Sequence, residues 1–114
     1  MNITAELDAL ITGLGLPVET GKFSSKPPEE YVVVTPLGET FALHCDNRPE
    51  YETQEARLSL YSKKNYVARK KQIVKALLRA GFTITLRQYM GREDDVGYFH
   101  YTIDAQKLYR WEID

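Results

Sequence analysis

Apolar and polar residues alternate along this chain with two different periods, and each change of period marks an expected element. Apolar residues recur at helical spacing over residues 3–14, where a short amphipathic helix is predicted. A second helix is predicted over residues 64–80, and Gly81 is suited to end it. Its buried stripe is expected to contain Val67, Ile73, Val74, Leu77 and Leu78.

Strand patterns fill most of the remaining chain. Residues 18–23 predict a short strand, and the run at 31–35 is apolar on both sides, which indicates a strand in the interior of a sheet. Turn residues at 36–38 (PLG) predict a hairpin that leads into another strand at 41–45. Residues 53–61 alternate strictly, so we expect one dry face and one face that is wet or interfacial.

Three strand-like segments follow the second helix, at 82–87, 98–103 and 108–113, and a loop is expected at 90–97. A bulge or break is expected near Ala105-Gln106. The expected order is α-β-β-β-β-α-β-β in one α+β domain over residues 1–114. Its sheet should be mixed but largely antiparallel, with about five or six strands packed against the two helices.

Composition narrows the class of protein. The chain has 114 residues, a mass of 13.1 kDa, a net charge of −1 and one cysteine. A chain of this size buries roughly two-thirds of its unfolded surface, so it needs no disulfide or metal to fold. It has no apolar run long enough to span a membrane and no basic leader, so we expect no membrane partner and a reducing cytosol.

Tyrosine is abundant, with eight residues in so short a chain. One explanation is strand propensity, because aromatic side chains suit a half-buried pleated surface. The other is contact with protein partners, because tyrosine is favoured where one end of the side chain is apolar and the other is wet. The two explanations are compatible.

The sequence contains no readable catalytic, cofactor-binding or metal-binding motif. His44 and Cys45 are adjacent in an expected strand and so point to opposite faces, and His100 has no local partner. The acidic residues 93–95 lack the alternating spacing of a calcium loop, and indicate a hairpin tip or an acidic docking patch. We therefore expect a protein that is not an enzyme and carries no cofactor or metal.

The strongest local signal is basic. Seven cations fall within residues 63–79, and Lys71, Lys75 and Arg79 recur on one face of the expected helix. Like charges at this spacing repel one another by a few tenths of a kcal/mol per pair. Either the chain's own acids compensate this face in solvent, or the face meets an acidic partner or DNA.

Several segments together resemble a known family. They are PVETGKF at 17–23, EYVVVTPL at 30–37, DNRP at 46–49, the strand at 54–62, the basic helix from Lys64 and DVGYFHY at 95–101. In their order they resemble small prophage proteins of Gram-positive bacteria that are encoded among head–tail joining genes. The layout, over about residues 3–113, is similar to the tail-completion or tail-terminator proteins of long-tailed phages.

The resemblance implies a homo-oligomeric ring that caps the tail tube and joins it to the head connector, with DNA as passing cargo. It implies assembly in the host cytoplasm and a final place in the tail or neck of the virion. Three groups of residues then become candidates. The subunit-interface candidates are Arg57, Tyr61, Tyr98 and Tyr101, and the partner- or channel-facing cations are Lys64, Lys71, Lys75 and Arg79. The docking-loop candidates are Pro27, Pro28, Glu93, Asp94 and Asp95.

A different class of function remains open at this point. The basic helix at 63–79 would also suit a small regulatory module that binds nucleic acid or protein. Strands flank this helix, so direct base reading by a helix-turn-helix pair is not expected. Steeply salt-dependent affinity for DNA would favour this alternative.

Overall fold

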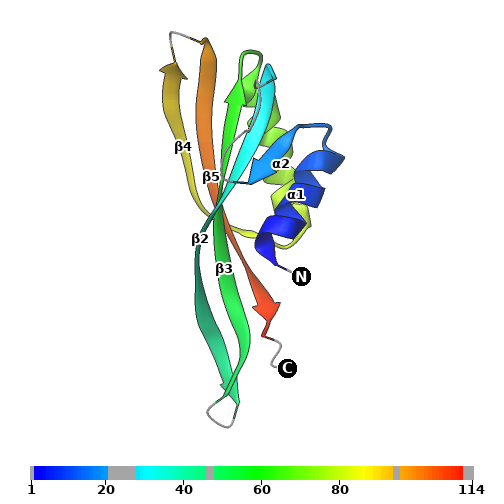
Figure 1. The fold of residues 1–114 in the computed structure, drawn as a ribbon, viewed down its shortest axis with the longest axis vertical. Coiled ribbons are helices and arrows are strands. Elements are labelled where there is room, and N and C mark those ends of the chain that lie inside the picture. The colour runs from blue at the N-terminus through cyan, green and yellow to red at the C-terminus, as the bar shows by residue number, and fades with distance from the viewer. Residues whose placement is uncertain (1, 21–27, 46–47, 94–95, 112–114) are drawn as a thin grey trace.

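The computed structural model describes residues 2–20, 28–45, 48–93 and 96–111, although the side chains of residues 42–48 are excluded from the description. In the described part, two helices and five strands follow one another along the chain (Figure 1). This confirms the predicted α+β class. The elements are α1 (Ile3–Gly13), β1 (Val18–Thr20), β2 (Glu30–Cys45), β3 (Arg48–Ser62), α2 (Tyr66–Arg79), β4 (Thr83–Glu93) and β5 (Tyr98–Arg110).

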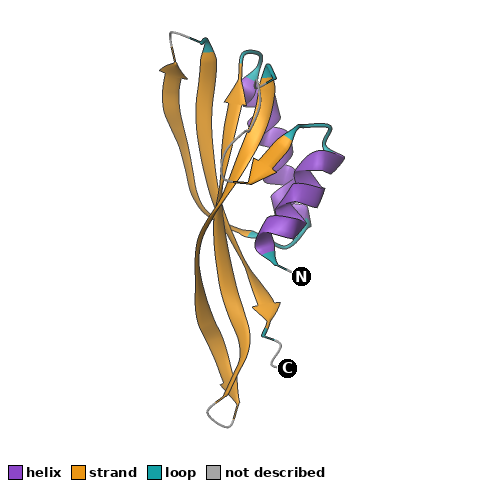
Figure 2. Cartoon of the chain, viewed as in Figure 1, coloured by secondary structure: helices purple, strands orange, loops and turns teal. Residues whose placement is uncertain are grey.

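The five strands form one sheet in the order β1-β2-β3-β5-β4. Only β1 and β2 run parallel, and the other pairs are antiparallel, so the sheet is mixed and largely antiparallel, as predicted. Both helices lie on one side of the sheet (Figure 2), where a single apolar cluster joins them to β2, β3 and β5. The opposite side, here called the open face, has no helix over it in the described part of the chain.

Each helix begins at an asparagine whose side chain accepts a hydrogen bond from a backbone N–H of the first turn. Asn2 caps α1 in this way, and Asn65 caps α2. In α2, Ile73 and Leu77 are buried as predicted. The prediction was wrong for Val67 and Leu78, which are 39% and 59% exposed. Around the helix axis, these two residues lie about 100° or more from the centre of the buried stripe. Their side chains are therefore on a face of the helix that does not point toward the sheet.

The predicted hairpin at Pro36-Leu37-Gly38 was wrong, because β2 runs through these residues as one long strand with a bulge between Pro36 and Gly38. The physical reason is pairing: β3 is long enough to pair with the whole of β2. In addition, β1 pairs only with residues 32–34, so Pro36 lies where β2 has no outer neighbour and a missing N–H is tolerated.

Two further boundaries differ from expectation. β4 continues to Glu93 through a bulge at Gly91, whose φ of 108° suits glycine, so the expected loop at 90–97 is much shorter. β5 is continuous from Tyr98 to Arg110, with no break at Ala105-Gln106. Its pairing with β3 is in regular register from Phe99 to Arg110, which satisfies the backbone on that side.

The alternation predicted for residues 53–61 is confirmed. Ala56, Leu58 and Leu60 of β3 are buried against the helices. The run at the start of β2 is buried on both faces, also as predicted, because Val32 and Val34 enter the helix-side core while Tyr31 and Val33 pack with Tyr98 on the open face. Neither helix in the described part is long and apolar enough to cross a membrane.

The sheet extends well beyond the helices (Figure 1), and the molecule measures 54 × 26 × 23 Å. We call this extension the arm: residues 38–45 of β2, 48–55 of β3 and 106–110 of β5, which are paired with one another. Among the described side chains, none of the buried apolar ones belongs to the arm. Phe41 and Leu108 are instead exposed on it, at 48% and 46%.

Candidate interaction surfaces

A hollow lined by cations lies between α2 and the outer strands of the sheet. Its volume is about 490 Å³, and we call it the basic groove. Tyr101, which is buried, and Val74, which is half-buried, supply its apolar part, and the Lys70 ammonium lies 4.6 Å from the centre of the Tyr101 ring. The lining residues are Lys70, Lys71, Val74, Lys75, Arg87 and Tyr101.

α2 itself contains no acidic residue. Two cations near its beginning are paired, because Arg69 contacts Glu30 at 3.3 Å and Lys64 approaches Glu29 at 3.7 Å. Of the predicted partner-facing cations, Lys71, Lys75 and Arg79 are exposed and have no ion-pair partner among the described residues. Lys64 therefore differs from the other three predicted cations, because it has an acidic partner within its own chain.

A bulge explains why sequence reasoning missed Arg87. Strict alternation from Phe82 would place Arg87 on the face opposite to Ile84. The register shift between Ile84 and Leu86 inserts one residue, so Arg87 pairs opposite Ile103 on the helix side and reaches the groove. A bulge of this kind leaves little signal in a single sequence.

Four aromatic rings form a cluster on the open face. Tyr31 stacks on Tyr61 with ring centres 4.9 Å apart, and Tyr61 stacks on His100 at 4.3 Å. Tyr98 meets the edge of Tyr31 at 5.5 Å. Burial raises the pKa of the Tyr31 hydroxyl to about 12, with Tyr61 as the next cause, and burial likewise raises the pKa of Tyr61. These hydroxyls therefore stay protonated at physiological pH.

Burial favours the neutral form of His100 in this cluster. Burial lowers the pKa of His100, and the nearby Glu93 carboxylate opposes that shift only in part. Its buried Nε2 atom has no hydrogen-bond partner among the described residues. A charged imidazolium would need a partner that this arrangement does not supply.

Arg57 and Asp104 form a bidentate ion pair on the open face. Arg57 Nε and Nη2 donate to the two carboxylate oxygens of Asp104 at 2.8 and 2.9 Å. The hydrogen bond and charge of Asp104 raise the pKa of Arg57. The Asp104 side chain is only 9% exposed, whereas that of Arg57 is 41% exposed.

The four predicted interface residues therefore have different surroundings. Arg57 and Tyr61 lie on the open face and are both half-buried. Tyr98 and Tyr101 are each only 6% exposed, so they pack within the monomer and offer little to a neighbour. They also lie on opposite sides of the sheet, since Tyr98 joins the open-face cluster and Tyr101 the helix-side core.

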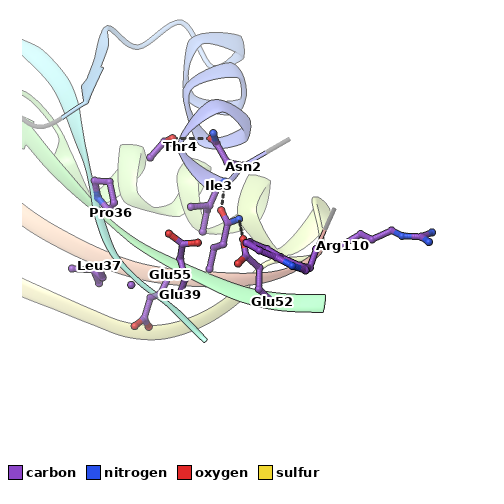
Figure 3. Close-up of a pocket in the computed structure, with 12 residues that line it drawn as sticks. Asn2, Ile3, Thr4, Pro36, Leu37, Glu39, Glu52, Glu55 and Arg110 are labelled. Carbon is purple, nitrogen blue, oxygen red and sulfur yellow. Dashed lines mark hydrogen bonds between the residues drawn. The ribbon is translucent and has the colours of Figure 1, made fainter. Parts of the chain in front are cut away.

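A second hollow, of about 670 Å³, lies where the arm meets the start of α1 (Figure 3). Three carboxylates line it, those of Glu39, Glu52 and Glu55, and Arg110 extends away from them. Gln54 bridges its wall, because its Oε1 accepts from the Ile3 N–H at 2.8 Å and its Nε2 donates to Glu52 at 2.6 Å. None of the three carboxylates has an ion-pair partner among the described residues.

The predicted docking loops are only partly covered by the structure. Pro27, Asp94 and Asp95 lie outside the described residues. The Pro28 carbonyl accepts a hydrogen bond from the Tyr98 hydroxyl, which connects this segment to the open-face cluster. Glu93 ends β4 and is close enough to influence the pKa values of Tyr31, Tyr61 and His100.

Within the described residues, no group of three or more His, Cys, Asp or Glu side chains is placed to hold a metal ion. The side chains of His44 and Cys45 lie outside the description. Comparison with protein-family models finds no match, and no curated protein is significantly similar to the chain in sequence.

Proposed function

We propose that this chain is a structural subunit of the head–tail junction of a long-tailed phage or prophage. In this proposal, copies of the chain form a ring that completes the tail tube and joins it to the head connector. The proposal combines the resemblance of the sequence segments with one structural observation, the arm. It places the protein in the host cytoplasm during assembly and in the virion neck afterwards.

The arm supports the proposal because an isolated monomer would gain little stability from ordering it. The start of α1 contacts the arm only at its base, through Gln54, Lys107 and Tyr109. A narrow ribbon of strands without a covering layer is only marginally stable in water, and ordering each residue costs about 1–2 kcal/mol. None of its described side chains is a buried apolar one, and Phe41 and Leu108 remain exposed. An arm of this kind is expected where a neighbouring subunit or the tail tube covers it.

The edges of the sheet favour contact through side chains over simple strand addition. The outer strand β4 is interrupted by bulges after Ile84 and Tyr89, and β2 by irregularities after Pro36, Phe41 and Leu43. Bulges twist an edge away from a new partner strand. Neighbouring subunits are therefore expected to meet through the arm, the open face and the charged hollows.

The test is removal of the gene from the phage or prophage that carries it, followed by negative-stain microscopy of the particles. Overlong tails, or finished tails beside unjoined full heads, are the expected result, and they should disappear when the gene is supplied in trans. A matched variant, Phe41→Asp on the arm, should fold but fail to complement. Normal particles from the deletion, or a complete lack of capsids, would refute the proposed role.

A second candidate function is supported by the exposed cations of α2, two of which line the basic groove. A module that binds nucleic acid would use the unpaired cations Lys71, Lys75 and Arg79 on phosphates. Such binding would weaken with salt, with a slope of log affinity against log salt of roughly −0.9 per phosphate neutralised. A failure to bind duplex DNA at low salt would exclude this candidate.

A further inference from the structure

The basic groove has a composition that specifies what could fill it. Its cationic residues are Lys70, Lys71, Lys75 and Arg87, and none has an ion-pair partner among the described residues. Between them lie the side chain of Val74 and the buried ring of Tyr101. A ligand that fits would present one apolar side chain flanked by carboxylates, because the cations lie close enough together to repel one another when nothing neutralises them.

The chain itself contains such a segment. Residues 112–114 read Glu-Ile-Asp and follow directly after Trp111 at the end of β5. The apolar side chain of Ile113 therefore has a carboxylate residue on each side of it in the sequence. One apolar residue between two acidic ones matches the composition of the groove, in which Val74 and Tyr101 lie among cations.

The segment cannot reach the basic groove of its own copy. Tyr101 in the groove and Trp111 are ten residues apart along β5 and its end, which is roughly 33 Å at the rise of a strand. Residues 112–114 extend at most about 10 Å beyond Trp111. The occupant must therefore come from a second copy of the chain.

We propose that residues 112–114 of one copy occupy the basic groove of the next. The contact joins two different surfaces, so it is heterologous and can close into a ring. In that respect the inference rests on the proposed ring function, whereas the binding of the segment to the groove can be tested without any phage. The arm extends away from the body of its own copy (Figure 1).

The experiment is a titration of the isotopically labelled full chain with a synthetic peptide of residues 108–114 (LYRWEID), followed by amide chemical shifts. Saturable shifts are expected at residues 70–75 and at Arg87. A peptide with Glu112→Lys and Asp114→Lys should bind at least tenfold more weakly, and so should the wild-type peptide to the chain with Lys71→Glu and Lys75→Glu. The charge-reversed peptide should bind that chain better than it binds the wild-type protein.

A matched control carries the same change of charge outside the groove, Lys63→Glu with Lys64→Glu, and should bind the peptide as the wild type does. The proposal is overturned if no saturable shift occurs at millimolar peptide, if the shifts fall outside the groove, or if both peptides bind equally. Groove shifts caused by a DNA duplex but not by the peptide would overturn it as well and assign the groove to nucleic acid. Normal virions from the gene deletion would refute the phage role and leave a positive titration standing.

Discussion

The ion pair between Arg57 and Asp104 separates two roles for the open face. Arg57 was a candidate for contact with a neighbouring subunit, but in the structure it donates two hydrogen bonds to Asp104 of the same chain. The Asp104 side chain is 9% exposed, so replacing Arg57 leaves a carboxylate largely removed from water without its partner. A charge left in this way costs more than the pair contributes, and it should be the dominant effect.

The magnitude follows from the unequal exposure of the two side chains. Arg57→Ala should lower the free energy of unfolding by about 2 kcal/mol, the usual penalty for an unsatisfied buried group. Asp104→Ala should cost about 1 kcal/mol, because the 41% exposed guanidinium can turn to water. The double variant has no carboxylate left without a partner. Its loss of unfolding free energy should therefore be about 1 kcal/mol smaller than the sum of the two single losses.

The assay is urea denaturation of the four proteins of this cycle, followed by circular dichroism at one pH and salt concentration. A loss below about 0.5 kcal/mol for Arg57→Ala, within the range of ordinary surface changes, would refute the reasoning. So would a larger loss for Asp104→Ala than for Arg57→Ala. If Arg57→Ala keeps full stability yet abolishes assembly, then Arg57 acts at a subunit interface, as the sequence suggested.

Three further measurements test the fold and the state of His100. Leu77→Ala should lower the free energy of unfolding by about 2–5 kcal/mol, because the side chain is fully buried. Leu78→Ala, one position along, should lower it by less than about 0.5 kcal/mol. Equal losses in urea denaturation would mean that α2 is rotated about its axis. Asn65→Ala should cost about 1 kcal/mol through loss of the helix cap, and Asn65→Asp should restore most of it; no loss would deny the cap. Because burial lowers the pKa of His100, the unfolded chain takes up this proton first. The contribution of His100 to stability should therefore be constant above about pH 6.5 and fall as the pH drops from there to the lowered value. An unchanged pH dependence in His100→Phe would contradict this.

Much of the fold could be predicted because local periodicity carries it. The alternation of residues 53–61 specified which face of β3 is buried, since a strand side chain can point only to one side or the other. Helix positions followed from apolar spacing and from Gly81, whereas the asparagine caps were recognised only in the structure. The class of fold then followed from the order of these elements, because a helix stripe and a sheet face must cover one another.

The places where prediction failed are those where pairing decides. Pro36-Leu37-Gly38 has the composition of a turn, but the length of β3 keeps β2 extended through it. The bulge after Ile84 moves Arg87 to the helix side of the sheet. A single inserted residue reverses every side chain beyond it, and neighbouring strands, not local propensity, determine where it occurs.

The candidate surfaces divide in the same way. The sequence by itself determined that the second helix would be rich in cations and free of acids, because charge is a property of the residues alone. Only the tertiary structure decided which of those cations are paired, and that Lys71, Lys75 and Arg87 line one groove with Tyr101. The arm also belongs to the tertiary structure, because its length depends on the register of three strands that are distant in sequence. Composition determines the charges and the apolar area, and pairing between distant segments determines where they converge.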